Sequence, residues 1–492
     1  MTETTTKTSI SRYITHNAEA DPDRPAITHE GKTITRRQLD LSTNRLARAY
    51  EKLGVRQDDL VTVALPNSIE FYQACIAIWK LGATPQPVSA RLPKPEQEAI
   101  VELAQPSLVV GVEPGSLGDF PAVPAAYEPD PELSDDLLPD RIARHWKAPT
   151  SGGSTGRPKI IVAAGESAFD YSASLPLRQE RNRAQLVPGP LYHNAPFSFS
   201  VQGLCLGNHL IVMTRFDAEE TLQLIEQWQV DWMMLVPTMM LRIWKLPEET
   251  RNRYDLSSLR IVLHLAAPCP AWLKEAWIHW LGGERIHELF AGTEATGATW
   301  ITGDEWLAHR GSVGKLMGAG RVKIVGEQGE ELPAGQIGEI YLLPAGGPGS
   351  TYHYIGAEPK AIEGGWESLG DMGYVDEEGY IYLSDRKTDM ILSGGANIYP
   401  AEVEAAIDGY EGVRSSAVIG LPDEDMGQVV HAIVDAPEGL DENQLLTYLG
   451  ERLARYKIPR TIEVVNQPLR DDAGKTRRSA LLQERLQTRT AG

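Results

Sequence analysis

The 492-residue sequence predicts an α/β protein with a large multi-subdomain N-terminal domain of layered α/β sheets and a small α+β C-terminal domain. Three observations lead to this class. The length exceeds what one compact core usually supports. Helical and strand patterns alternate between residues 35 and 88, as in layered α/β sheets. Beyond Gly320 short strands alternate with Gly-containing turns, and beyond Asp389 helices and strands mix. We expect a boundary near residues 386–389, giving domains 1–387 and 388–492.

The individual elements follow from apolar spacing and turn residues. Leu39, Leu46 and Leu53 share one helical face, and Gly54 ends that helix. The run LVTVAL predicts a strand, and a second helix is predicted between residues 68 and 81. The Pro-, Gly- and acid-rich residues 112–139 predict a surface connection. In the C-terminal domain the patterns predict helices over 400–407 and 442–456 and strands over 415–421, 428–435 and 461–465.

Composition excludes several classes of partner. The sequence has 47 Lys and Arg against 67 Asp and Glu, a net charge of -20, which repels nucleic acid and anionic membranes. Cys75, Cys205 and Cys269 are far apart and offer neither a disulfide framework nor metal-ligand spacing. The N-terminus has no apolar leader segment, and the longest apolar stretch, 232–244, is shorter than the ~20 residues that span a bilayer. These features predict a soluble, cytoplasmic protein.

The sharpest local motif is the segment TSGGSTGRPK at residues 150–159. Its glycines allow consecutive backbone N–H groups to face one anion, and the segment adds the hydroxyls of Ser154 and Thr155 and the charge of Lys159. The alternative, a flexible linker, is less favoured because Pro158 and Lys159 lead into an apolar strand. The segment is not a Walker A loop, since it lacks Gly-Lys-Ser/Thr at the required spacing. It therefore predicts a polyphosphate-binding loop.

This loop resembles the phosphate loop of the adenylate-forming superfamily, which includes acyl-CoA synthetases, peptide-synthetase adenylation domains and firefly luciferase. Further motifs of that superfamily recur in order between about residues 10 and 485, at 265–268 (LAAP), 290–294 (FAGTE), 368–371 (SLGD), 385–389 (DRKTD) and 472–475 (DAGK). Each motif alone has a structural explanation, but their joint order does not. The chain is identified as a member of the acyl-CoA synthetase, or acid–CoA ligase, type.

The resemblance implies a role for each matching residue. Thr293 contacts the α-phosphate, Glu294 holds Mg²⁺, Lys475 is the adenylation lysine and His193 is the gate between acyl pocket and thiol tunnel. Thr388 is the hinge about which a mobile C-terminal domain rotates. The implied nucleotide-binding residues are Ser154, Thr155, Gly156, Lys159, Ala266, Ala267, Pro268, Phe290, Asp371 and Arg386. The implied coenzyme A-binding residues are Ser393, Gly394 and Gly395.

Several positions depart from the superfamily pattern, and none removes a charge or a metal ligand. They are Gly152, Ile160, Ala266, Ala291 and Leu369. They affect fine geometry and leave the implied reaction intact. A substrate carboxylate attacks the α-phosphorus of ATP and expels pyrophosphate, and a thiol then attacks the acyl-adenylate. Because the first step joins two anions, it requires charge neutralisation and an in-line approach.

The acyl pocket implied by the resemblance consists of His193, Asn194, Phe197, Gly203, Met239, Ala291 and Gly292. Asn194 occupies the place where amino-acid-activating domains carry Asp, and no acidic residue follows before Gly207. An unpaired buried ammonium is costly, so amino acid substrates are disfavoured. The apolar lining, with room expected beside Gly203, Ala291 and Gly292, predicts a hydrophobic and bulky or polycyclic carboxylic acid.

Three functional hypotheses remain open from the sequence. The favoured one is an acid–CoA ligase that uses ATP, Mg²⁺ and coenzyme A. The second is a stand-alone adenylating enzyme whose acceptor is an amine or a carrier-protein thiol. The third is a non-catalytic nucleotide sensor, which the presence of Glu294, Asp371, Arg386 and Lys475 disfavours. The predicted partners are a small carboxylic acid, ATP and coenzyme A, with the homodimer kept as an open assembly state.

Overall fold

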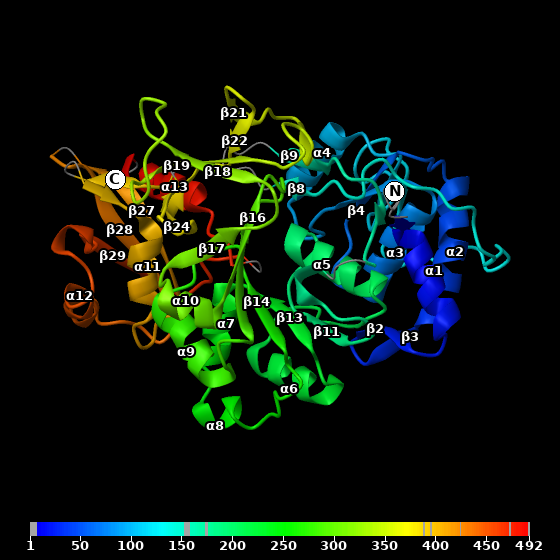
Figure 1. Cartoon of the computed structure of the whole chain (residues 1–492), viewed down its shortest axis with the longest axis horizontal. Helices are drawn as coiled ribbons and strands as arrows, with labels where there is room; N and C mark the ends of the chain where they lie inside the picture. The colour runs from blue at the N-terminus through cyan, green and yellow to red at the C-terminus, as the bar shows by residue number, and fades with distance from the viewer. Residues whose placement is uncertain are drawn as a thin grey trace.

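The computed structural model describes residues 7–151, 158–172, 176–386, 389–393, 396–423, 425–471 and 474–490. Helices and strands alternate through a large N-terminal part, and a smaller part with its own sheet follows at the C-terminal end (Figure 1). This arrangement confirms the predicted α/β class. Among the described residues, no helix has the length and apolarity needed to cross a bilayer.

The first subdomain is built on a parallel sheet with strand order β5-β4-β6-β7. Its strands are β4 (Leu60–Val63), β5 (Thr84–Pro87), β6 (Leu108–Val110) and β7 (Ala122–Val123). Its helices are α1 (Ile10–Ala20), α2 (Arg36–Lys52), α3 (Ile69–Lys80) and α4 (Lys94–Ala104). The helix–strand alternation predicted for residues 35–88 is confirmed. The predicted connection 112–139 differs in that it contains the short strand β7, which pairs with β6.

Local chemistry explains where α2 and α3 begin. The Thr35 hydroxyl accepts from the Gln38 N–H while the Gln38 side chain accepts from the Thr35 N–H, which is a capping box. The Ser68 hydroxyl accepts from the Phe71 N–H at the start of α3. Gly82, with φ +68°, follows the end of α3 in the left-handed region that glycine tolerates.

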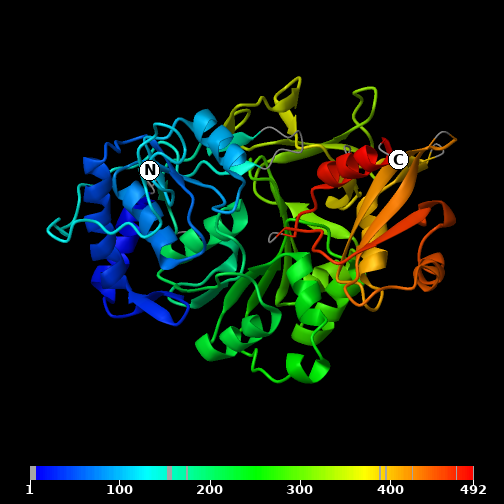
Figure 2. The same ribbon diagram turned by 180° about the vertical axis from the view of Figure 1, so that it is seen from behind.

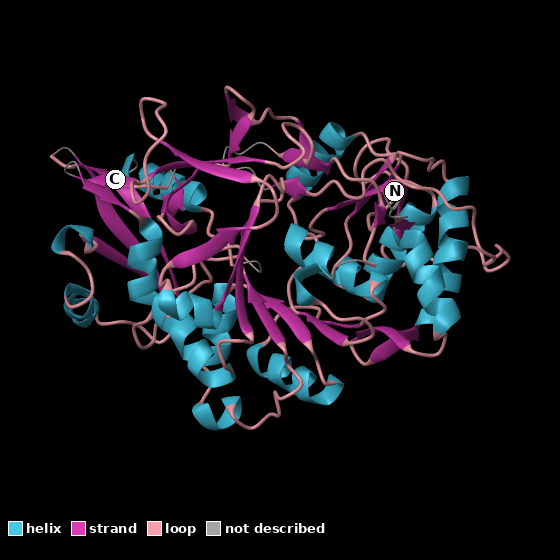
Figure 3. Ribbon diagram, in the orientation of Figure 1, coloured by secondary structure: helices cyan, strands magenta, loops and turns pink. Residues whose placement is uncertain are grey.

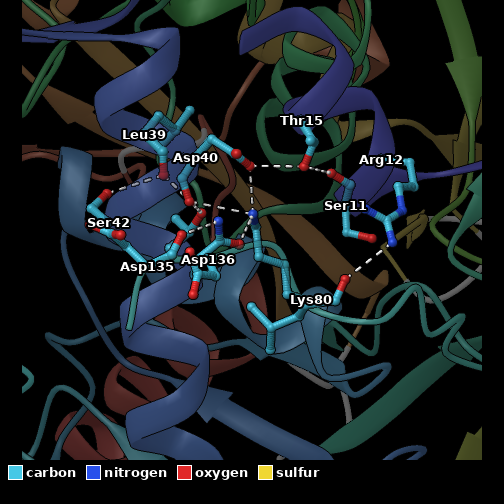
Figure 4. A network of polar contacts seen from close by, with 12 residues as sticks. Ser11, Arg12, Thr15, Leu39, Asp40, Ser42, Lys80, Asp135 and Asp136 are labelled. Carbon is cyan, nitrogen blue, oxygen red and sulfur yellow. Dashed lines mark hydrogen bonds and ion pairs between the residues drawn. The ribbon is translucent and has the colours of Figure 1, made fainter. Parts of the chain in front are cut away.

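A buried polar network joins α1, α2 and α3 (Figure 4). The Lys80 ammonium donates to Asp40 Oδ1 over 2.6 Å and to Asn44 Oδ1 over 2.5 Å, and the Thr15 hydroxyl donates to Asp40 over 2.9 Å. Lys80 is only 3% exposed, and burial lowers its pKa although Asp40 acts in the opposite direction. The Asp40 carboxylate therefore compensates the buried charge of Lys80 inside the layer of helices.

The centre of the molecule is a large mixed sheet with path order β21-β22-β19-β23-β24-β17-β16-β15-β14-β13-β11-β12-β2-β3, and β18 pairs with β19. The part of this path between β3 and β15 consists of β2 (Pro25–His29), β3 (Lys32–Thr35), β11 (Ala184–Val187), β12 (His209–Val212), β13 (Trp232–Leu235), β14 (Ile261–His264) and β15 (Ile286–Ala291). The others are β16 (Ala298–Thr302), β17 (Ser312–Leu316), β18 (Arg321–Val325), β19 (Gly338–Leu343), β21 (Lys360–Ile362), β22 (Trp366–Ser368), β23 (Asp371–Val375) and β24 (Tyr380–Arg386). Smaller sheets are formed by β8 (Thr150–Ser151), β9 (Lys159–Ala163) and β20 (Tyr352–Ile355), and by β1 (Thr8–Ser9) and β10 (Ala168–Phe169).

Helices cover both faces of the parallel part of this sheet (Figure 3). The helices are α5 (Asn194–Cys205), α6 (Ala218–Trp228), α7 (Pro237–Trp244), α8 (Glu248–Arg251), α9 (Ala271–Leu281) and α10 (Gly303–Ala308). Successive side chains of a strand point to opposite faces of the sheet. On β13, Met233 and Leu235 therefore face a core with α6, α7 and α9, whereas Trp232 and Met234 face a core with α5. Strands buried on both faces explain the near-continuous apolar runs in this region.

The small sheet has the order β26-β25-β28-β27, and β29 pairs with β28. Its long strands, coloured orange, lie on the side of the molecule where the C-terminus is marked (Figure 2). Its elements are β25 (Ile391–Ser393), β26 (Ala396–Ile398), α11 (Pro400–Asp408), β27 (Ser415–Asp423), β28 (Gly427–Asp435), α12 (Glu442–Gly450), β29 (Thr461–Val465) and α13 (Arg478–Thr490). The prediction of one helix over 442–456 is wrong, because α12 ends at Gly450. Leu449 is its last buried side chain, and no residue from 451 to 458 is buried, so packing does not extend the helix.

The change from the large to the small sheet occurs within a few residues. The last strand of the large sheet, β24, ends at Arg386, and the small sheet begins with β25 at Ile391. The expected boundary residues Lys387 and Thr388 lie outside the described residues.

Candidate functional site

The candidate site lies where parallel strands of the large sheet end. The strands β11, β13, β14 and β15 are parallel neighbours, so the segments that follow them meet at one edge. Residues 188–193 follow β11, residues 236–238 follow β13, and Ala266 to Pro268 follow β14. Open α/β sheets bind ligands outside the carboxyl ends of their strands. The fold therefore brings three separated sequence segments to one binding edge.

The predicted adenine segment has a distinctive backbone. Ala266 has φ +76°, a left-handed conformation that side chains with a Cβ seldom adopt. Ala266 and Pro268 are exposed, Ala267 is half-buried, and all three directly follow the buried strand β14. Phe290 is half-buried near the end of the neighbouring strand β15. These two segments are adjacent, as binding of one flat base between them requires.

Glu294 is the centre of a polar cluster at the same edge. It is 7% exposed, and its Oε1 accepts from the Tyr354 hydroxyl over 2.6 Å. The Lys159 ammonium lies 2.9 Å from Tyr354 Oη and 3.5 Å from Glu294 Oε1. Burial and the bond to Glu294 raise the pKa of Tyr354, so its proton stays on the phenol. The fold thus brings together Lys159 and Glu294, which are 135 residues apart in sequence.

A loop from the β-rich region closes over this cluster. A Cβ on Gly292 would overlap the Leu369 side chain and lie 3.1 Å from Glu294 Oε2. Leu369 belongs to the motif 368–371, so this glycine allows the motif to approach Glu294. Asp371 then begins β23 and is the register partner of Arg386 on β24. The backbones of the two predicted ribose and phosphate ligands therefore lie on adjacent strands. Thr293 is half-buried between Gly292 and Glu294.

The loop that carries Lys475 reaches this edge from the small domain. Gly474 is buried, and a Cβ built on it would lie 2.5 Å from Thr238 Oγ1 and 3.2 Å from Val236 Cγ2. Lys475 itself is exposed, and its charge lowers the pKa of His193. The lysine loop is thus in contact with the start of α7, where β13 ends, and close to the start of α5.

Ion pairs fix the two sides of the lysine loop to the small domain. Glu404 of α11 accepts from Arg470 over 3.1 Å and from Arg478 over 2.8 Å, and Arg478 also donates to Asp389 over 2.8 Å. Glu404 is 3% exposed, which makes these charge-assisted bonds strong. Arg470 and Arg478, which stand before and after Lys475 in the sequence, are thus both bonded to α11 of the small domain.

Further contacts hold the small domain against the large one. The Lys245 ammonium donates to the carbonyls of Asp408, over 3.3 Å, and Val413. The Trp272 indole donates to the Ala405 carbonyl over 3.4 Å, and Arg477 lies 3.8 Å from Glu96. The domain arrangement in this structure therefore has the predicted lysine at the binding edge.

The start of α5 forms the third side of the site. His193 is the N-cap residue, its ring lies 4.3 Å from the Tyr192 ring, and its buried Nε2 has no hydrogen-bond partner. Burial and the charge of Lys475 lower the pKa of His193 to about 3, so the imidazole is neutral near pH 7. The adjacent Asn194 accepts from the ammonium of the buried Lys147. A neutral histidine and the amide partner of a buried lysine therefore stand side by side.

The sequence predicted free space for an acyl group beside Gly203 and Gly292, and the structure shows that this space is filled. A Cβ on Gly203 would overlap Gln185 Oε1, so this glycine lets α5 pack against β11. The space beside Gly292 is filled by Leu369. Ala291, in contrast, is exposed at the end of β15. Room for an acyl group beside Gly203 and Gly292 was therefore wrongly expected.

Two other predicted pocket residues lie in packed cores. Phe197 is 1% exposed and packs against Phe71, Trp79 and Trp146, with ring centroids 5.9–6.2 Å away. Met239 is 4% exposed and belongs to the core beneath α7 and α9. Helical position explains this, because successive residues of a helix face different layers.

Some predicted residues cannot be placed against the site. Ser154, Thr155, Gly156, Thr388, Gly394 and Gly395 lie outside the described residues. Ser393 is buried and pairs with Ala396 and Gly427 within the small sheet.

Sequence reasoning missed two residues of the site, Tyr354 and Lys147. Tyr352 and Tyr354 alternate in a short strand, which predicts a shared face but not a carboxylate partner 60 residues away. Lys147 stands alone in a segment without helical or strand periodicity, so nothing in the sequence signals its burial.

The residues present fit a single divalent cation shared with a polyphosphate. The described residues contain no group of three or more His, Cys, Asp or Glu side chains that could hold a metal. Mg²⁺ is usually held by one or two carboxylates together with substrate phosphates. One buried carboxylate, Glu294, beside Lys159 is compatible with that type of site.

Comparison with known proteins agrees with this geometry. The family model described as AMP-binding enzyme matches residues 14–354, and the model of the AMP-binding enzyme C-terminal domain matches residues 402–475. A long-chain-fatty-acid–CoA ligase of Mycobacterium tuberculosis is 31% identical over 92% of this chain and 93% of its own length. A feruloyl-CoA synthase of Amycolatopsis is 32% identical over 95% of this chain and 97% of its own length.

A solved structure shares the fold over nearly the whole chain. It is the o-succinylbenzoate CoA synthetase of Bacillus subtilis in complex with an acyl-adenylate intermediate, with a TM-score of 0.80 at 24% identity. The match covers 97% of this chain and 98% of that one. At this identity the likeness supports the fold alone.

Proposed function

The chain belongs to the AMP-binding enzyme family, and from that premise we propose that it is an ATP-dependent acid–CoA ligase. It activates a hydrophobic carboxylic acid as the acyl-adenylate and transfers the acyl group to the thiol of coenzyme A. The observation that carries this proposal is the position of the lysine loop. Gly474 packs on Thr238 at the carboxyl edge of the parallel sheet, at the edge where Glu294 and Lys159 meet.

In the first half-reaction, the carboxylate oxygen attacks the α-phosphorus and pyrophosphate leaves. Lys475 neutralises the two approaching anions, and Lys159 binds the phosphates that depart. Mg²⁺ on Glu294 supplies further positive charge to the phosphates when bound. Thr293 contacts the α-phosphate and Asp371 accepts from the ribose hydroxyls. Thr293 follows Gly292 and Asp371 begins β23 two residues after Leu369, and Gly292 and Leu369 are in contact.

The remaining nucleotide contacts are proposed on the same basis. They are made by Ser154, Thr155 and Gly156 of the phosphate loop, by Ala266, Ala267, Pro268 and Phe290 around the adenine, and by Arg386.

In the second half-reaction, the thiol attacks the acyl carbonyl and AMP leaves. We propose two domains, residues 1–387 and 388–492, with Thr388 as the hinge between them. Rotation at the hinge withdraws Lys475 and brings Ser393, Gly394 and Gly395 to the site. His193, neutral near pH 7, separates the acyl pocket from the thiol path without repelling a cationic group.

The proposed substrate is a hydrophobic, bulky or polycyclic acid. The pocket side of α5 offers Asn194 and no carboxylate, which disfavours ammonium-bearing substrates. The fatty-acid and feruloyl ligases that resemble this chain also act on largely apolar acids. We place the reaction in the cytoplasm, where ATP and coenzyme A are available, and keep a homodimer as the assembly to test by light scattering.

A two-stage assay tests the function. Purified protein is incubated with ATP, Mg²⁺ and a panel of fatty, aromatic and polycyclic acids, and pyrophosphate release is measured. Active acids are then incubated with coenzyme A, an amine or a carrier-protein thiol, and products are identified by mass spectrometry. We expect pyrophosphate release with hydrophobic acids and a coenzyme A thioester. An amide or carrier thioester in its place would transfer the proposal to the alternative acceptor, and no pyrophosphate release with any acid would refute adenylation.

A further inference from the structure

Lys147 is a buried cation at the start of α5. The residue is 7% exposed, and its carbonyl accepts from the Ala163 N–H over 3.1 Å, which ties its segment to β9. The ammonium donates to Asn194 Oδ1 and, over 2.8 Å, to Ser198 Oγ. Asn194 and Ser198 are four residues apart, so they present neighbouring side chains on one face of α5. The backbone and the helix together fix the position of the charge.

No carboxylate compensates this charge among the described residues. The partners of Lys147 are two neutral side chains and the ring of Trp146, whose centroid lies 4.3 Å from Nζ. Burial alone lowers the pKa of Lys147 to about 7, so near pH 7 about half of the molecules carry the charge, and an acceptor oxygen bound beside the amine would favour the charged form. Two other lysines that the structure describes as buried differ: Lys80 lies 2.6 Å from Asp40, and Lys274 lies 2.5 Å from Glu288. Lys147 thus stands apart from the lysines that stabilise the cores.

The start of α5 adds to the positive potential at this point. The first turn of a helix carries unpaired N–H groups and the positive end of the helix dipole. A cation placed there is unfavourable unless an electron-rich group binds between them. Buried ammonium groups are normally paired, and a buried ionisable group whose pKa is strongly shifted by desolvation is a candidate for a functional site.

The location connects this charge with the acyl site. Asn194 directly follows His193, and the charge of Lys475 lowers the pKa of His193. In the proposed function the reacting carboxylate approaches Lys475, and His193 separates the acyl pocket from the thiol path. The body of the acid would then lie against the turn of α5 that carries Asn194. A group on that body, a short distance from the carboxylate, then comes within reach of Asn194 and the ammonium behind it.

We propose that Lys147 is a specificity-determining residue that, with Asn194, receives a second oxygen acceptor on the body of the acid substrate. The acceptor is a carboxylate or a carbonyl oxygen. This inference rests on the proposed function and narrows its substrate class from purely apolar acids to apolar acids with one such oxygen. No bond to the substrate forms or breaks at Lys147; its contribution is binding and orientation.

The test compares acids that differ only in the additional oxygen. Suitable pairs are phenylbutyrate with benzoylpropionate, benzoylpropionate with its ortho-carboxylated derivative, and dodecanoate with dodecanedioate. The first pair reports on a carbonyl and the other two on a carboxylate. Wild-type protein, Lys147→Met and the matched control Ser198→Ala are assayed by pyrophosphate release. Lys147→Met keeps the length of the side chain without its charge, and Ser198→Ala removes one partner but keeps the charge.

We expect the wild type to favour the oxygenated member of at least one pair by about 10- to 100-fold in kcat/KM, the range for a hydrogen bond to a charged group. Lys147→Met is expected to bring that ratio close to one while the plain acid is still adenylated, and Ser198→Ala is expected to retain it. Adenylation of the plain acid shows that the variant is folded.

Equal loss of activity on both members of a pair, an unchanged ratio in Lys147→Met, or no preference in the wild type would overturn the assignment. If wild-type protein adenylates no acid at all, the proposed function itself fails. These two failures are distinguished by the wild-type assay alone.

Discussion

Replacement of Gly474 by alanine tests whether the lysine loop works in the position that this structure shows. Gly474 is buried next to Lys475, with its φ at +75°. A Cβ there would lie 2.5 Å from Thr238 Oγ1 and 3.2 Å from Val236 Cγ2, both on the large domain. Ordinary contacts of such atoms are longer than about 3.5 Å. The variant should therefore oppose docking of the loop without changing any charged group.

The expected magnitude has two parts. Left-handed backbone costs about 1–2 kcal/mol for a residue with a Cβ, but this strain persists when the loop is undocked. The overlap with Thr238 exists only in the docked state, and overpacking of this kind costs about 1–3 kcal/mol. Since about 1.4 kcal/mol changes a population tenfold, we expect adenylation to fall about 10- to 100-fold. Lys475→Ala, which removes the charge itself, should fall further, by orders of magnitude.

The assay separates the two half-reactions. ATP–pyrophosphate exchange measures adenylation, and thioester formation from supplied acyl-adenylate measures transfer, which should stay near the wild-type rate. Gly439→Ala is the matched control, because Gly439 has φ +85° and a Cβ added to it would meet no atom within 4 Å. It should reproduce the strain without the loss of adenylation. Thr238→Ala combined with Gly474→Ala removes the nearest atom and should restore part of the activity.

Three results would refute the reasoning about Gly474. One is full adenylation activity in Gly474→Ala, and another is equal loss of both half-reactions. The third is a loss in Gly439→Ala as large as that in Gly474→Ala, because it would assign the effect to backbone strain in the small domain.

Three other substitutions give sharp outcomes. Tyr354→Phe removes a 2.6 Å hydrogen bond to Glu294. The rate of adenylation should therefore fall about tenfold, and the variant should need a higher Mg²⁺ concentration for its half-maximal rate. An unchanged Mg²⁺ dependence would contradict this role of Tyr354. His193 has a pKa lowered to about 3, so its unfolded form binds more protons between pH 3 and 6.5. Wild type should therefore lose more thermal stability than His193→Phe as pH falls through that window, whereas parallel melting curves count against it. Lys80→Met leaves the buried Asp40 carboxylate without its cationic partner. The free energy of unfolding, measured by urea titration, should therefore fall by about 3–5 kcal/mol. A loss below about 1 kcal/mol would show that the ion pair is dispensable for stability.

Much of the fold could be predicted because its signals are local. The capping residues Thr35 and Ser68 and the apolar spacing of α2 and α3 are local, and these helices lie where the pattern predicts them. The helix expected over 442–456 failed because its second half has no buried side chain after Leu449. Helix length there depends on packing partners, which a local pattern does not contain.

The predicted site is only partly a matter of sequence. Glu294, Lys159 and Lys475 were identified by motifs, since such motifs combine a charge with a backbone shape that does not depend on distant residues. The space beside Gly203 and Gly292 could not be predicted, because Gln185 and Leu369 come from other strands and loops. Tyr354 was missed for the same reason: its bond to Glu294 joins two elements 60 residues apart.

The sequence by itself determined the family, the class of reaction and the groups that carry charge, because each is encoded in short runs of residues with a fixed chemistry. Only the tertiary structure decided which of the predicted pocket side chains are buried in cores and which are exposed. It placed Phe197 and Met239 in cores. It also buried Lys147 beside Asn194, with no carboxylate partner among the residues that the structure describes. The physical reason is that burial and pairing are properties of several chain segments together, whereas a motif is a property of one.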